Sequence, residues 1–296
     1  MLYKQIQENK QKTVLLVTLF SLLALGAGWA IGYLFNGDSL SGVVIALVIL
    51  AFYIPITYMS ATSQVLSMSG AKEIKREDNP QLFGIVEELS IAARVPMPKV
   101  YIINDPAPNA FATGIKPEKG AVAFTTGLLE RLNREELSGV VAHELAHIRN
   151  YDIRLMTICI ALVGVIIIIA DFGSRMLFWG RGGRSNNNRK SNPALLLIAL
   201  LFIILAPLVA QFARLAVSRN REYLADATAV EFTRNPVGLI NALKKISSDP
   251  REVKSAKEAT ASMYISQPFG RKRRRRGNLL ATHPPIESRI ERLEKM

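Results

Sequence analysis

The chain has 296 residues, of which 49% are hydrophobic, and its formal net charge is +13. The apolar residues are concentrated in a few long runs, which excludes a purely soluble protein and predicts an integral membrane protein. The basic residues lie beside these runs and in one late segment, where they favour contact with anionic lipids. No nucleic-acid-binding motif accompanies them, so we expect no nucleic-acid partner.

Two apolar runs near the N-terminus predict the first two transmembrane helices, at residues 14–35 and 42–58. Residues 1–13 carry three lysines, whereas the connection at 36–41 has no Lys or Arg. By the positive-inside rule, the N-terminus and the chain beyond residue 60 are therefore cytoplasmic. The first run is longer than the apolar region of a signal peptide, so we expect it to be retained.

Gly28 and Gly32 lie four residues apart in the first run. Such a pair lets two helices approach closely. The partner is either a second subunit, which makes a homo-oligomer possible, or the second helix of the same chain. The sequence leaves both alternatives open.

Residues 61–151 have the composition of a soluble region, and we expect it to be the cytoplasmic catalytic region. Its helices follow from apolar periodicity and its strands from β-branched and aromatic runs between turn residues. The expected elements are a helix at 81–93, a strand at 99–103, an antiparallel hairpin formed by 109–114 and 121–126, and helices at 128–133 and 135–149.

The last of these helices contains the sequence His-Glu-Leu-Ala-His at residues 143–147. Residues four apart lie on one face of a helix, so His143 and His147 can bind one zinc ion per chain. Glu144 lies beside the first ligand and can serve as general base toward a water molecule. The alternative is a pair of surface histidines on an ordinary amphipathic helix. Because two of the three histidines of the chain lie here, we favour the zinc site.

Two further apolar runs, at residues 153–170 and 194–217, predict a third and a fourth transmembrane helix. The linker between them, 178–193, is basic and rich in Gly and Asn. If Glu222 binds the same metal as His143, the linker lies outside the cytoplasm despite its positive charge. Either the positive-inside rule is violated here, or the two helices form a hairpin that does not cross fully; we favour two full spans.

Residues 218–296 predict a second cytoplasmic region that completes the zinc site. Short helices are expected at 236–246 and 252–263, and a last helix at 286–295. The basic run at 271–276 is either a solvated loop or a tether to anionic lipids.

Glu222 is the best candidate for the third zinc ligand, and His283 is its rival. Asp226 lies one helical turn after Glu222, where it can accept a hydrogen bond from the second ring nitrogen of a ligating histidine. On these residues alone, both carboxylates could instead be ordinary helix residues that pair with Arg219 and Arg221.

HELAH, SRNREYLADA at residues 218–227, THPP before the terminal helix, and four apolar runs in this order resemble the HtpX family of membrane zinc metalloproteases, relatives of the CAAX prenyl endoproteases. The resemblance covers nearly the whole chain. It implies that His143, His147 and Glu222 bind zinc. It also implies that Glu144 is the general base, that the active site faces the cytoplasm at the cell inner membrane, and that the substrates are misfolded or damaged membrane proteins.

The resemblance also implies a substrate-binding strand. The stretch Asn109, Ala110, Phe111 and Ala112 matches the family's edge strand beside the cleft, where an extended substrate can add as a β-strand. A plain structural hairpin is the alternative.

Two residues near the C-terminus are further candidates. His283 could stabilise the tetrahedral oxyanion or transiently cap the zinc, and a helix-capping His-Pro turn is its alternative. Arg289 could orient Glu222 or the oxyanion.

The predicted fold is a mainly α integral membrane protein, with four apolar helices and a cytoplasmic zincin-like α+β catalytic domain that contains a small β-sheet. The predicted function is that of a zinc-dependent endopeptidase whose polypeptide substrates are the membrane proteins named above. The alternatives are a non-catalytic zinc-binding scaffold or sensor and a zinc-regulated transporter. Glu144 argues against the scaffold, because a purely structural site needs no base beside an open position. The scarcity of charges within the apolar runs argues against the transporter.

Overall fold

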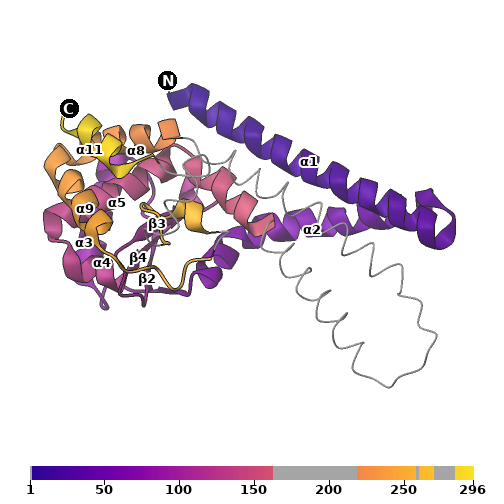
Figure 1. The fold of residues 1–296 in the computed structure, drawn as a ribbon, viewed down its shortest axis with the longest axis horizontal. Coiled ribbons are helices and arrows are strands. Elements are labelled where there is room, and N and C mark those ends of the chain that lie inside the picture. The colour runs from indigo at the N-terminus through magenta and orange to yellow at the C-terminus, as the bar shows by residue number, and fades with distance from the viewer. Residues whose placement is uncertain (1, 163–218, 258–259, 270–283) are drawn as a thin grey trace, which may run out of the picture.

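The computed structural model describes residues 2–162, 219–257, 260–269 and 284–296. Helices α1 (Leu2–Asn36) and α2 (Ser39–Met68) form a hairpin that projects from a domain containing the remaining elements (Figure 1). Within the described part of the chain, α2 is long and apolar enough to cross a membrane, with a mean hydropathy of 2.4 in its most apolar window. Both helices continue beyond the predicted apolar runs, because their polar flanks also adopt helical structure.

The two helices of the hairpin approach each other closely through glycines. A Cβ atom on Gly28 would lie 2.5 Å from the carbonyl oxygen of Gly42, and one on Gly32 would lie 2.6 Å from that of Asp38. The Asp38 side chain caps α2 by accepting hydrogen bonds from two backbone N–H groups of its first turn. The glycine pair therefore packs against the second helix of the same chain.

The domain is built around a mixed sheet with the strand order β1-β2-β4-β3. Its strands are β1 (Ala71–Glu73), β2 (Lys99–Ile103), β3 (Ala110–Thr113) and β4 (Ala121–Thr125). Strand β2 pairs in parallel with β4 and antiparallel with β1, and β3 pairs antiparallel with β4. The predicted hairpin is confirmed, and the short polar strand β1 was not predicted.

Helices make up the rest of the domain. They are α3 (Pro80–Ala93), α4 (Thr126–Arg131), α5 (Arg134–Arg149), α8 (Arg219–Thr233), α9 (Pro236–Ser248) and α11 (Ile286–Leu293), with short 3-10 turns at Pro117–Lys119 and Ala261–Met263. Helices α8, α9 and α11 pack with one another, and α8 and α9 also pack with α5. Residues 152–162 are also helical.

Helix α5 lies at the centre of the domain, where it contacts β3, α3, α8 and α9 (Figure 1). It begins at a capping box, in which the side chains of Asn133 and Glu136 bond each other's backbone N–H groups. Glycines bring α9 unusually close, because a Cβ atom on Gly139 would lie 2.6 Å from the backbone nitrogen of Leu239. This packing buries α5 on nearly all sides, which is uncommon for a helix with so many polar residues.

One predicted helix is wrong. Within 252–263, only Ala261–Met263 forms a short 3-10 turn, and the other described residues are not helical. Long-range hydrogen bonds hold this segment instead: the Val253 N–H donates to the carbonyl of Pro268, and the Ser255 N–H donates to Asp105. These contacts satisfy the backbone without a helix.

Several predictions lie outside the described residues. They concern the third run beyond residue 162, the linker at 178–193, the fourth run at 194–217, the basic run at 271–276, and His283.

Candidate active site

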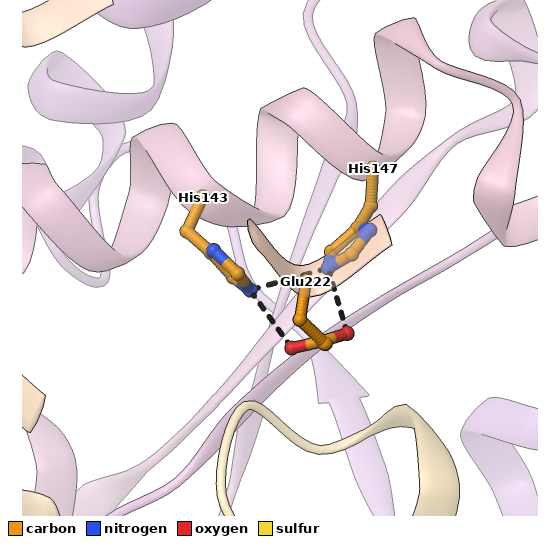
Figure 2. Close-up of side chains that lie close together, drawn as sticks. All are labelled: His143, His147 and Glu222. Atoms are coloured by element: carbon orange, nitrogen blue, oxygen red, sulfur yellow. Dashed lines mark hydrogen bonds and ion pairs between the residues drawn. The ribbon is translucent and has the colours of Figure 1, made fainter. Parts of the chain in front are cut away.

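Two histidines of α5 and one carboxylate of α8 meet at a single point (Figure 2). The two Nε2 atoms of His143 and His147 lie 3.1 Å apart. The carboxylate of Glu222 reaches both rings, with Oε2 3.7 Å from Nε2 of His143 and Oε1 3.6 Å from Nε2 of His147. Three potential metal ligands from two elements far apart in the sequence therefore face one another.

This arrangement fits a tetrahedral zinc ion. Ligands at 2.0–2.1 Å from zinc in tetrahedral geometry lie about 3.3 Å from one another. The two Nε2 atoms lie 3.1 Å apart, and each has one oxygen of Glu222 within 3.6–3.7 Å, so the separations are close to that value. Two imidazole nitrogens with one carboxylate are also a ligand set that zinc enzymes use, and it leaves a fourth position open.

Asp226 orients the first histidine. Its Oδ1 atom lies 3.0 Å from Nδ1 of His143, which is fully buried. A carboxylate accepts the hydrogen bond, so neutral His143 carries its proton on Nδ1 and leaves Nε2 for a metal. The contact is the one that the spacing of Glu222 and Asp226 on one helix predicted.

Asp152 does the same for the second histidine, and it was not predicted. Its Oδ2 atom lies 3.2 Å from Nδ1 of His147. Asp152 follows the end of α5, five residues after His147, so no helical spacing places it on the same face as the histidines. The only signal in the sequence is a carboxylate directly before an apolar run, which also has an ordinary reading as a helix start.

Arg289 on α11 is fully buried and pairs mainly with Asp226. Its Nε and Nη2 atoms donate to the two oxygens of Asp226 at 2.8 and 2.7 Å, and Nη1 donates to the carbonyl of Ile265 at 2.9 Å. Nη1 also lies 3.4 Å from Oε2 of Glu222. The arginine thus contacts Glu222, as predicted, but its shortest bonds are to Asp226.

Burial and charge shift the protonation of the site. Burial raises the pKa of Glu144 to about 8. Burial and the positive charge of Arg289 lower the pKa of His143 to about 4. Burial would also lower the pKa of His147, but the hydrogen bond to Asp152 and the negative charge of Glu222 outweigh it and raise that pKa to about 9. Burial alone would raise the pKa of Asp226, but the charge of Arg289 and the hydrogen bonds from His143 and Arg289 together hold it below its usual value.

A cleft of about 410 Å³ opens beside the histidines. Its lining includes the polar residues Glu144, His147 and Glu222 and the apolar residues Ile153, Met156 and Met263. Neither carboxylate oxygen of Glu144 has a side-chain hydrogen-bond partner among the described residues, and the backbone of Ala112 is the polar group beside it. The general-base candidate is therefore buried beside the open side of the ligand cluster, where it is available to a water molecule.

The predicted substrate strand corresponds to β3 and the residue before it. Ala112 lines the cleft. Strand β3 is at the edge of the sheet, but its outer side is partly paired with the chain itself: the Ile265 N–H donates to the carbonyl of Ala110 at 2.9 Å, and Phe111 forms a β-bridge with Tyr264. The Asn109 side chain bonds the backbone of Ser266.

Comparison with known proteins agrees with the class of enzyme that this geometry indicates. The profile of peptidase family M48 matches residues 76–296, and the chain belongs to this family. It is therefore a membrane metalloendopeptidase. Two curated relatives are the protease HtpX homologs of Listeria monocytogenes serotype 4a (strain HCC23) and Ligilactobacillus salivarius (strain UCC118), which are 53% and 52% identical to it, each over 100% of both chains. The resemblance to the HtpX family is thus confirmed.

Among solved structures, the crystal structure of S. mikatae Ste24p aligns with a TM-score of 0.49 at 19% identity. The alignment covers 99% of the present chain and 67% of that protein.

Proposed function

We propose that the chain is a zinc-dependent endopeptidase in which His143, His147 and Glu222 hold the metal and Glu144 is the general base. The observation that carries this proposal is the convergence of the three ligands beside the buried carboxylate of Glu144, which has no side-chain hydrogen-bond partner among the described residues. A structural metal site needs neither an open coordination position nor an adjacent base.

The chemistry divides between the metal and the protein. A zinc ion at this position supplies Lewis-acid polarisation of the scissile carbonyl and lowers the pKa of a water molecule. Glu144 takes a proton from that water and then donates it to the leaving amine. Burial raises the pKa of Glu144 above its ordinary value, which would help it to hold the proton until the amine leaves. The positive charge of a bound zinc ion would lower that pKa and keep the carboxylate ionised for the first transfer.

The surrounding residues support the ligands. Asp226 and Asp152 fix the orientation of the two imidazoles, and Arg289 neutralises the negative charge of Asp226 and Glu222. Further proposals concern His283, as an oxyanion stabiliser or transient metal ligand, and β3, as the strand to which an extended substrate adds.

We further propose that the substrates are misfolded or damaged membrane proteins and that the cleft faces the cytoplasm. Four transmembrane helices would hold the enzyme in the cell membrane. The hairpin of α1 and α2, which places a long apolar helix next to the catalytic domain, supports this arrangement (Figure 1). The lysines near the N-terminus and the basic run at 271–276 favour anionic lipids on the same side.

The test is cleavage of unfolded casein by the detergent-purified full chain, stripped of metal and then supplied with zinc. We expect zinc-dependent cleavage by the wild type and none by Glu144→Gln, which should still bind one zinc ion. Equal cleavage by both proteins would refute the role of Glu144. Zinc binding without cleavage by either would favour the scaffold alternative, and retained zinc binding by Glu222→Ala would refute the ligand assignment.

A further inference from the structure

The N-terminal part of α1 lies beside the catalytic domain, whereas the rest of the helix projects away from it (Figure 1). Asn9 is 2% exposed, and its Nδ2 atom donates a 2.9 Å hydrogen bond to Oδ1 of Asp152. One turn later, the hydroxyl of the buried Thr13 donates to the carbonyl of Asn9. A polar residue from the helix that leads into the membrane is therefore buried beside the metal-ligand cluster.

The two carboxylate oxygens of Asp152 contact different residues. Oδ1 accepts from Asn9, and Oδ2 is the atom 3.2 Å from Nδ1 of His147. The terminal torsion of an aspartate side chain has broad minima, so its rotamer alone does not fix the plane of the carboxylate. The hydrogen bond from Asn9 does fix it, while Arg221 lies farther away, at 3.7 Å from Oδ1.

The side chain of the residue before Asp152 also contacts α1. Tyr151 has a φ angle of 59°, a left-handed conformation that is unfavourable for a residue with a Cβ atom. The ammonium group of Lys10 lies 5.5 Å from the centre of the Tyr151 ring, within the range of a cation–π contact. Neighbouring residues of α1 thus contact both the ring of Tyr151 and the carboxylate of Asp152.

We propose that Asn9 is a positioning residue for the metal ligand His147 and acts through Asp152. This inference rests on the proposed zinc site. It makes the cytoplasmic end of α1 a part of the site, so the placement of this helix in the membrane is coupled to metal affinity. Asn9 touches neither substrate nor metal, and its effect is on the orientation of the imidazole.

The experiment measures zinc affinity rather than activity. The full chain in detergent is titrated with zinc against a competing chelator at fixed pH. Residues that orient a ligating histidine typically contribute 10–100-fold to metal affinity, so we expect Asn9→Ala to lose about tenfold, the low end for an indirect contact. The matched control is Gln11→Ala, an exposed position on the same helix, whose affinity should change less than about twofold.

A double-mutant cycle separates positioning from general support of the fold. If Asn9 acts through Asp152, then Asn9→Ala should cause no further loss of affinity in an Asp152→Ala background. An equal loss in both backgrounds would overturn the proposal, as would unchanged zinc affinity in an Asn9→Ala protein whose thermal unfolding is that of the wild type. Failure of the wild type to bind zinc would instead overturn the proposed function itself.

Discussion

The protonation of His147 predicts a steep dependence of zinc affinity on pH. In the metal-free chain its pKa is raised to about 9, so at pH 7 the imidazole carries a proton on both nitrogens. Zinc must displace the Nε2 proton to bind, because a metal binds only the neutral imidazole. His143, with a pKa lowered to about 4, is neutral throughout this range and adds no dependence.

The magnitude follows from the fraction of neutral His147. About 1% of a group with a pKa near 9 is neutral at pH 7 and half is neutral at pH 9, so the apparent zinc affinity should rise about 50-fold between these values. Glu144, whose pKa is raised to about 8, becomes negatively charged over the same range and acts in the same direction. Zinc binding at pH 7 should therefore release about one proton from His147.

Two measurements check this reasoning on the full chain in detergent. Zinc dissociation constants are obtained by chelator competition at pH 7, 8 and 9, and proton release is obtained by calorimetry in buffers of different ionisation enthalpy. Asp152→Ala removes the hydrogen bond that raises the pKa of His147, so the rise should move to lower pH. A wild-type affinity that is constant from pH 7 to 9, with no proton released, would refute the argument that Asp152 and Glu222 outweigh burial at His147.

Two further predictions concern the support of the site. Gly139→Ala should destabilise the domain by about 1–3 kcal/mol, because the new Cβ atom would lie 2.6 Å from the backbone of Leu239. Gly84→Ala, where nothing lies within 4 Å, should be neutral or slightly stabilising, and equal thermal unfolding of the two variants would contradict the close packing of α5 and α9. Arg289→Ala leaves Asp226 buried without its ion-pair partner and should cost about 3–5 kcal/mol. Unfolding by denaturant at pH 7 measures this loss, and a change below about 1 kcal/mol would mean that the pair does not stabilise the fold.

The parts of the site that follow a regular spacing could be predicted from the sequence. Residues four apart on a helix share a face, which relates His143 to His147 and Glu222 to Asp226. Asp152 could not be found in this way, because it lies beyond the end of α5 and reaches His147 only through the left-handed turn at Tyr151. Gly, Asn and Asp are the residues that signal such a turn, and Tyr is not one of them.

Elements of the fold with a local sequence signal could also be predicted, whereas elements that depend on contacts distant in the sequence could not. Helix α5 and the hairpin of β3 and β4 have local signals, namely a capping box and two apolar segments separated by the turn-forming residues 116–120. Strand β1 is three residues long and polar, and it exists because it pairs with β2. The prediction of a helix is wrong at 252–257 for the opposite reason. Its composition allowed a helix, but long-range bonds such as that from Ser255 to Asp105 hold it in an irregular path.

The pairing of residues 264 and 265 with the outer side of β3 has a consequence for any strand that would add there. A segment of the same chain competes at an effective concentration in the millimolar range or above, whereas a passing polypeptide is far more dilute. It also shields an exposed sheet edge that would otherwise recruit strands indiscriminately. A substrate strand that pairs along all of β3 must displace the N–H of Ile265 from the carbonyl of Ala110. Only a polypeptide that remains extended and close to the site competes well for that position.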